Sequence, residues 1–352
     1  MKQIGLFDES NRLKKLSALG DPLEKLNCVI DWRMFEDMLN KVLAKEQKGV
    51  GGRPPYSYLL MFKILILQRL FNISDDQTEY QINDRVSFMR FLGLSLGDRV
   101  PDAKTIWLFR DTLAKAAVME DLFHLFNLQL ERQGIISHKG TIVDATFVEA
   151  PRQRNTREEN RQIKEGKTPE AWDKPENVSK VRQKDTDARW TTKNRERHFG
   201  YKDHVKVDAD SKVITAYSVT DASIHDSRAL IELIDETDQV LYADSAYSGN
   251  PIADKLPKEI KNQIQEKGYR NRPLTEQQKA ENKRKSRIRS RIEHVFGYMT
   301  GSLHGITVRS IGIARAKFNI GLTNLIYNLC RYAILKRRMS SQDSYAQIRV
   351  ES

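Results

Sequence analysis

Two short apolar runs in the second half of the chain each meet an aspartate. The run 141–148, Thr-Ile-Val-Asp-Ala-Thr-Phe-Val, carries Asp144 in its interior, and the run 240–243, Val-Leu-Tyr-Ala, leads directly into Asp244. Apolar, β-branched runs of this length are typical of buried strands, where an ionised aspartate is rarely found without a compensating partner. The chain is therefore predicted to contain a buried sheet that carries carboxylates, and strand ends of α/β sheets are where catalytic groups gather.

Each of these acids also has an ordinary structural explanation. Asp144 could accept a hydrogen bond at a turn, and Asp244 could cap a following helix. A third acid, Glu293, lies in a helical segment rich in Arg and Lys. It could form an ion pair with Arg289, four residues earlier, worth only about 0.3–0.5 kcal/mol. Glu293 nevertheless shares the apolar stripe of its helix, so it could also project inward.

Residues 1–135 are expected to form an all-helical domain. An apolar helix is predicted at 56–71, Ser74 begins a capping-box pattern, and Asp102 is predicted to cap a further helix. Short helices with tight turns suit a DNA-binding domain and a helical dimerisation domain equally well.

The second domain is expected at 136–340, followed by a tail at 341–352. Strands are predicted near 201–207 and 213–219, with a helix starting at Asp226. The stretch from about 152 to 197 is almost entirely polar and is predicted to be a flexible insertion or long loop. Strands that alternate with helices after a helical domain indicate an α/β fold.

The charge of the chain indicates a polyanionic partner. Fifty-nine Lys and Arg against 47 Asp and Glu give a formal net charge of +12, which favours nucleic acid or an anionic membrane surface. Since no apolar run approaches the roughly 18 residues that cross a bilayer, nucleic acid is the favoured partner. The two cysteines, Cys28 and Cys330, lie in apolar contexts and are predicted to be buried thiols in a reducing cytoplasm.

Asp144, Asp244 and Glu293 together suit divalent metal ions. Magnesium and manganese prefer oxygen ligands, and two ions roughly 3.5–4 Å apart can activate an attacking oxygen and stabilise a leaving one. Phosphodiester chemistry needs such an arrangement because its transition state adds charge beside an anionic backbone. Nearby Lys and Arg would then hold the flanking phosphates.

Other residues were weighed for the same chemistry. Dispersed histidines are less suited to it than carboxylates, Asp203 and Asp208 favour strand-edge or turn roles, and Asp226 favours an N-cap. Trp172 and Trp190 could stack on unpaired bases or anchor the polar insertion. The histidines concerned are His198, His204, His225, His294 and His304.

Several motifs resemble those of DDE transposases from bacterial insertion sequences, and most closely the insertion-sequence-five family. The resemblance is carried by Gly140-Thr-Ile-Val-Asp144-Ala-Thr, Tyr242-Ala-Asp244-Ser-Ala-Tyr-Ser-Gly249 and Arg289-Ser-Arg-Ile-Glu293-His-Val-Phe-Gly297, and also by Gly52-Arg-Pro-Pro-Tyr56, Val100-Pro-Asp102, His198-Phe-Gly-Tyr-Lys202 and Ile224-His-Asp-Ser227. It implies a ribonuclease H-like mixed-sheet catalytic core. The first Asp would lie on the first strand, the second just after the fourth strand, and the Glu on a later helix.

The resemblance also implies a site and a reaction. Asp144, Asp244 and Glu293 would bind Mg²⁺ or Mn²⁺, with two ions at the site. The Arg of the family pattern is present as Arg289, whereas its Tyr and Lys positions hold Ser286 and Thr300. Residues expected to contact DNA are Arg289, Lys283, Arg284, Lys285, Arg287 and Arg291.

The function implied is a transposase that binds the terminal inverted repeats of its element, cuts one strand and joins the 3′ end to target DNA. A homodimer on double-stranded DNA and a cytoplasmic, nucleoid-associated location are expected. Two alternatives stay open from the residues: a nuclease of the same fold that cuts without joining, and a non-catalytic DNA-binding regulator.

Overall fold

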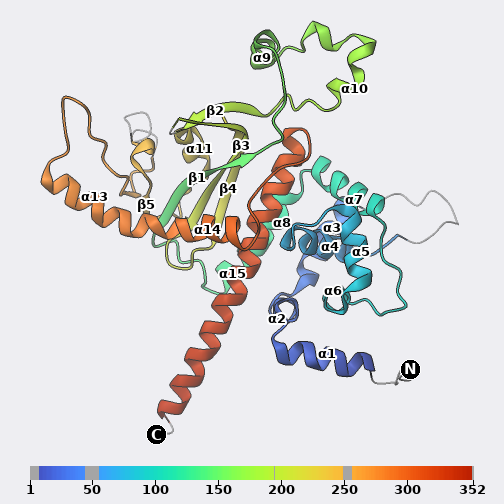
Figure 1. Cartoon of the computed structure of the whole chain (residues 1–352). Coiled ribbons are helices and arrows are strands. Elements are labelled where there is room, and N and C mark those ends of the chain that lie inside the picture. Colours follow the sequence, from blue (N-terminus) through green and yellow to red (C-terminus); the bar gives the residue numbers. More distant parts are fainter. Residues whose placement is uncertain (1–7, 44–54, 194, 249–255, 351–352) are drawn as a thin grey trace. The chain divides into compact units, whose positions relative to one another are not determined.

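The computed structural model describes residues 8–43, 55–193, 195–248 and 256–350, with the side chains of all but Ala171 and 341–350. The chain divides into two compact units (Figure 1). One consists of Met1–Ile135 with Leu322–Ser352, and the other of Ile136–Gly321. The second unit thus ends at Gly321, whereas residue 340 was expected from the sequence.

The first unit is helical. Ser74 and Asp102 accept hydrogen bonds from the backbone N–H groups of Gln77 and Thr105, so both are N-caps as predicted. Its helices are α1 (Asp8–Leu19), α2 (Pro22–Val29), η1 (Trp32–Phe35), α3 (Glu36–Leu43), α4 (Tyr58–Leu70), α5 (Asp75–Asp84), α6 (Val86–Leu92), α7 (Ala103–Lys115) and α8 (Met119–Arg132).

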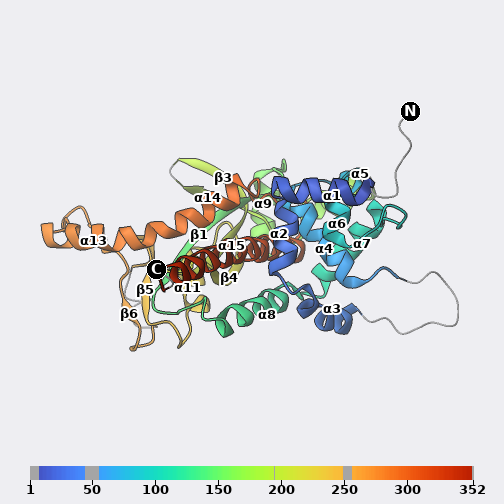
Figure 2. The same ribbon diagram turned by 90° about the horizontal axis from the view of Figure 1, so that it is seen from below.

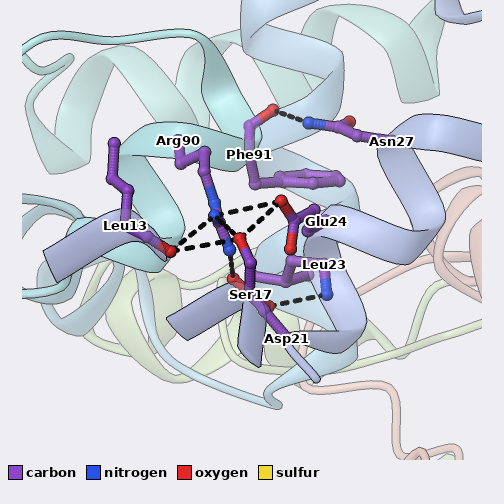
Figure 3. Close-up of polar contacts among 8 residues, drawn as sticks. All are labelled: Leu13, Ser17, Asp21, Leu23, Glu24, Asn27, Arg90 and Phe91. Carbon is purple, nitrogen blue, oxygen red and sulfur yellow. Dashed lines mark hydrogen bonds and ion pairs between the residues drawn. The ribbon is translucent and has the colours of Figure 1, made fainter. Parts of the chain in front are cut away.

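Arg90 of α6 is the centre of a polar cluster that ties α1 and α2 to α6 (Figure 3). Its guanidinium donates to Asp21, to Glu24 at 3.2 Å and to the Ser17 hydroxyl at 2.9 Å. The side chains of Arg90 and Asp21 are only 18% and 5% exposed. Because removing one partner of a buried pair leaves the other charge uncompensated, this cluster fixes α1 and α2 on the helical unit.

The long helix α15 (Ile313–Val350) begins in the second unit and contributes its later part to the first. Asn328 donates to Asn127 at 3.0 Å, and the Tyr332 hydroxyl donates to Gln133 at 2.8 Å. Asn127 and Asn328 are buried, so this pair satisfies amides that would otherwise be costly inside the core.

A mixed six-stranded sheet forms the second unit, which confirms the predicted ribonuclease H-like α/β class. Its order is β2-β3-β1-β5-β6, with β4 also paired to β3. β3 is antiparallel to β1, β2 and β4, while β1, β5 and β6 are parallel. The strands are β1 (Thr141–Glu149), β2 (Arg189–Lys193), β3 (Glu196–Asp208), β4 (Ile214–Asp221), β5 (Val240–Tyr242) and β6 (Lys261–Asn262).

Helices accompany this sheet. Leu230 and Leu233 of α11 (Asp226–Leu233) pack with Val143, Leu241 and Tyr247 in one buried cluster. Both views show α13 running on into α14 in nearly the same direction (Figures 1 and 2). The further elements are α9 (Arg157–Lys164), α10 (Val178–Val181), α13 (Glu276–Arg289), α14 (Glu293–Gly301) and the short η2 (Glu170–Trp172), η3 (Pro175–Asn177), η4 (Ser245–Tyr247) and η5 (Ser290–Ile292).

Gly200 lets the long strand β3 lie close against β1. Its φ is +149°, and a Cβ at this position would lie 2.2 Å from the carbonyl oxygen of Val148. Only glycine fits such an approach, so the Phe-Gly-Tyr run at 199–201 is explained by the pairing of the two strands.

The polar stretch 152–197 is more ordered than predicted. It contains α9, which begins with a capping box between Thr156 and Glu159, and it also contains strand β2. Trp172 is 4% exposed and donates its Nε1–H to Glu159 at 2.8 Å. Local caps and one buried indole thus order a segment whose composition indicated a loop.

The cysteine prediction was wrong for Cys28, which is exposed, and too strong for Cys330, which is half-buried. Cys28 lies near the end of α2, on a short helix that buries Leu23 and Leu26. The apolar neighbours of Cys28 in the sequence therefore face the core while the thiol does not.

Candidate active site

Asp144 and Asp244 are brought together by the register of two parallel strands. Thr141 pairs with Leu241 and Ile142 with Tyr242, so the same offset of 100 residues places Asp144 level with Asp244 just past the end of β5. Neighbouring strands lie about 4.8 Å apart. Asp144 lies on the first strand, as predicted. Asp244 follows the fifth strand, whereas the fourth was expected, because the polar insertion contributes the additional strand β2.

Asp144 lies in a partly buried position. Its carboxylate is 18% exposed, accepts a hydrogen bond from the Ala145 N–H at 2.8 Å and is bound by Arg289 Nη1 at 2.9 Å. Burial raises its pKa above the ordinary value, and the negative charge of Asp244 adds to this rise. A carboxylate held in this way favours a positively charged partner.

Asp244 is the N-cap of η4, and its carboxylate accepts a hydrogen bond from the Ala246 N–H at 2.7 Å. The capping role considered from the sequence is therefore present, although on a 3₁₀ turn. Since a cap uses one oxygen, the other remains available to a ligand.

Glu293 opens α14, directly after η5. Its side chain is 66% exposed, and its carboxylate accepts a hydrogen bond from Arg289 Nη2 at 3.4 Å. The predicted ion pair over four residues is thus present, at a length and exposure that contribute little to stability.

Arg289 connects two of the three acids. One terminal nitrogen binds Asp144 and the other binds Glu293, across 145 and 4 residues of chain. Its Nε is buried and has no hydrogen-bond partner in the described part of the chain. Arg289 therefore brings the helix that carries Glu293 to the strand that carries Asp144.

The donor set fits hard divalent cations, which prefer carboxylate oxygens. Asp144 and Asp244 are like charges in a partly buried site, an arrangement that a cation would relieve. Across residues 8–43, 55–193, 195–248 and 256–350, no three His, Cys, Asp or Glu side chains are grouped closely enough to hold a metal ion. Here the carboxylates of Asp144 and Glu293 are turned to Arg289, and that of Asp244 to its own cap.

Tyr247 is a site residue that the sequence analysis did not single out. It is 1% exposed, and its hydroxyl has no hydrogen-bond partner within the described residues. Burial raises its pKa, and the charges of Asp144, Asp226 and Asp244 raise it further. The signal available in the sequence was an aromatic residue three positions after Asp244.

Asp226 is not the N-cap that was expected. His225 takes that role through its Nδ1, and Asp226 instead binds the buried ammonium of Lys202 at 2.8 Å. Asp208 has the predicted turn role, because it accepts hydrogen bonds from the N–H and the hydroxyl of Ser211.

The other histidines and acids have hydrogen-bond partners or positions of their own. His198 binds Glu149 at 2.9 Å, and His204 binds Thr220. The strand-edge or turn role expected for Asp203 was wrong, because Asp203 is fully buried within β3, where it pairs with both β1 and β4. His294 is exposed on α14. These placements agree with the weight given to carboxylates over histidines.

The Lys and Arg side chains of residues 283–291, which were expected to contact DNA, differ in how exposed they are. Lys285 is 8% exposed and donates to the Ile264 carbonyl, so its ammonium is not at the surface. Arg284 is paired with Glu281, and Arg291 binds Ala209 and Asp210. Lys283 and Arg287 are exposed on α13.

Ser286 and Thr300, which stand where the family pattern has Tyr and Lys, form hydrogen bonds with nearby residues. Ser286 accepts a hydrogen bond from Gln265 at 2.6 Å, and Thr300 donates to the Phe296 carbonyl at 2.9 Å. Neither stands in for the missing side chain.

Comparison with known proteins gives three matches. A family model described as a transposase DDE domain matches residues 136–329, and a second, described as a transposase domain, matches residues 11–112. A cryo-EM structure of a piggyBac transposase synaptic complex with hairpin DNA is similar at 11% identity and a TM-score of 0.39, over 99% of this chain and 83% of that chain.

Proposed function

The chain belongs to the family of transposases with a DDE domain, and we propose that it cuts DNA at the terminal inverted repeats of its own element and joins the resulting 3′ end to target DNA. Two observations support this proposal: the register of β1 and β5 places Asp144 level with Asp244, and Arg289 binds both Asp144 and Glu293. The assignment to the insertion-sequence-five family remains a prediction.

DDE transposases use divalent metal ions, and we propose Mg²⁺ or Mn²⁺, with two ions held by these three carboxylates. When bound, the ions would activate the attacking oxygen and stabilise the leaving oxygen. Asp144 would contribute a carboxylate in a partly buried position, and Asp244 the oxygen that its cap leaves unused. Glu293, being the most exposed of the three, would complete the set from the helix side.

Arg289 has two roles in this proposal. Its guanidinium neutralises Asp144, which would otherwise be a half-buried charge without a partner. Once cations hold the carboxylates, its guanidinium is free to bind a phosphate of the DNA, for which its planar fork is suited.

Tyr247 would donate a hydrogen bond to an oxygen bound at this site. Its buried hydroxyl donor lies among the acids of the site and has no hydrogen-bond partner among the residues that the structure describes. A donor in this position would hold a water molecule or substrate oxygen beside Asp244.

The partner is double-stranded DNA. Exposed Lys283 and Arg287 on α13 would contact phosphates, with Arg284 and Arg291 joining them at the cost of their present ion pairs. Both ends of an element have to be processed together, so we propose a homodimer on DNA. In the described part of the chain, no helix combines the length and apolarity that a membrane span needs.

A strand-transfer assay with a pre-cut inverted-repeat end tests the proposal. Joined product that depends on Mg²⁺ or Mn²⁺ is expected, and it should disappear in Asp144→Asn and Asp244→Asn. Cleavage without joining would indicate a nuclease instead. DNA binding with neither reaction in the wild-type chain would indicate a regulator.

A further inference from the structure

The β2–β3 hairpin carries a group of exposed basic residues and one exposed tryptophan that no part of the proposed reaction uses. β2 is an end strand of the sheet and pairs with β3 from Arg189–Gly200 to Lys193–Glu196. We refer to the group as the hairpin patch. Its members are Arg152, Trp190, Lys193, Arg195 and Arg197, all exposed.

Three cations of the hairpin patch have no acidic partner within the described residues. Among the described residues, no carboxylate forms an ion pair with Lys193, Arg195 or Arg197. Elsewhere in the same insertion, Arg161 is paired with Glu158 and Glu165, and Lys167 with Glu165. Unpaired cations on an exposed hairpin favour an anionic partner.

Trp190 is presented to solvent from a fixed position. Its ring is 39% exposed, lies 5.1 Å from the buried ring of Phe199 and has the Arg152 guanidinium 6.0 Å from its centroid. Residues directly opposite in an antiparallel pair project to the same side, so Arg197, opposite Thr192, shares the face of Trp190. An aromatic ring flanked by cations suits a sugar–phosphate chain or a base.

Of the hairpin patch, Lys193 lies nearest the carboxylates, and it projects from the opposite face of β2 to Trp190, three residues earlier. The Lys193 ammonium is 5.6 Å from the Phe147 ring, three residues along β1 from Asp144. Its charge also acts on Asp144, lowering the pKa that burial raises. DNA held at the carboxylates would therefore extend within reach of Lys193.

We propose that the hairpin patch is a DNA-binding surface that grips the backbone of the duplex flanking the cleaved phosphate, with Lys193, Arg195 and Arg197 on phosphates and Trp190 against a sugar or base. This inference rests on the proposed function. Charge complementarity selects the partner, because residues 190–197 of the hairpin carry three cations against one acid, Glu196, and Arg152, which follows β1, lies over the Trp190 ring.

The salt dependence of DNA binding tests the phosphate contacts. The logarithm of the association constant falls with the logarithm of salt concentration by about 0.9 per neutralised phosphate. The triple variant Lys193→Ala/Arg195→Ala/Arg197→Ala should therefore lower the slope by about 2–3 on inverted-repeat DNA. The matched control is Arg161→Ala/Lys167→Ala, whose side chains are already paired with Glu, and its slope should not change.

Trp190→Ala should weaken binding roughly tenfold at every salt concentration without changing the slope, since stacking carries no charge. Trp190→Phe should restore most of the affinity. All the altered side chains are exposed, and an unchanged melting temperature checks the fold of each variant.

An unchanged slope in the triple variant, or an equal change in the control, would overturn the inference. The two proposals fail separately. If the wild-type chain joins DNA but the triple variant has the wild-type salt slope, the role of the hairpin patch is refuted and the proposed reaction stands. A slope change in a chain that neither cuts nor joins refutes the proposed reaction and leaves the binding surface standing.

Discussion

Replacing Arg289 by glutamine should tighten the binding of a divalent cation while impairing the reaction. The Arg289 guanidinium binds the carboxylate of Asp144 at 2.9 Å and that of Glu293 at 3.4 Å. A cation that binds these oxygens has to displace or share the arginine, and the glutamine variant removes that competition.

The size of the effect follows from the two contacts. The Asp144 contact is a charge-assisted hydrogen bond in a partly buried place, worth about 1.5–3 kcal/mol. The Glu293 contact is long and 66% exposed on the acid side, and it adds less than about 0.5 kcal/mol. Losing the competition should therefore tighten Mn²⁺ binding about tenfold or more, at 1.4 kcal/mol per factor of ten.

Titration of the metal-free chain with Mn²⁺, followed by electron paramagnetic resonance of the free ion, measures this affinity without DNA. Arg287→Gln is the matched control, since Arg287 is an exposed residue of the same helix, and its Mn²⁺ affinity should equal that of the wild type. If Arg289→Gln bound Mn²⁺ no more tightly than the control, the competition between arginine and metal would be refuted.

Three further predictions concern the residues around the sheet. Burial lowers the pKa of His204 to about 4 from 6.5, so the folded state binds fewer protons than the unfolded state between these values. Stability should fall by at most about 3 kcal/mol as pH drops from 6.5 to 4, and urea midpoints of His204→Gln should lose that dependence. Lys206 and Asp238 are buried and paired, so Lys206→Ala should lower the free energy of unfolding in urea by about 3–5 kcal/mol. The double variant Lys206→Met/Asp238→Asn should recover most of that stability, and an equal loss of stability in both variants would contradict the pairing argument. Tyr247→Phe removes a buried hydroxyl without a partner and should raise stability by about 1 kcal/mol, whereas a clear loss of thermal stability would show that the hydroxyl is satisfied.

The sheet was predictable because its strands are marked locally. The run 141–148 became β1, Thr141–Glu149, and the run 240–243 became β5 with one residue fewer. The extension of β3 back to Glu196 was missed, because its outer half is polar and is held by pairing with β2. Strand propensity is a property of the segment alone, whereas the pairing of β2 with β3 depends on contacts that exist only in the folded chain.

The positions of the candidate residues on strands and helices were predictable, and their contacts were less so. The spacing of Arg289 and Glu293 predicted their ion pair, but it could not predict the stronger bond from Arg289 to Asp144, 145 residues away. Lys285 belongs to a basic run that looks exposed throughout, yet its ammonium is buried against Ile264. Tyr247 was missed because its importance comes from an unsatisfied buried hydroxyl, a property that only the packed structure has.

The central claim is that Asp144 and Asp244 hold the metal ions of a strand-transfer reaction. It is tested most directly by exchanging carboxylate for thiolate, because soft ligands bind Mg²⁺ poorly and softer ions well. Joining of a pre-cut end by Asp144→Cys and Asp244→Cys should be lost with Mg²⁺ and partly restored with Mn²⁺ or Cd²⁺. A cysteine variant that joined DNA at the wild-type rate with Mg²⁺ would contradict the claim.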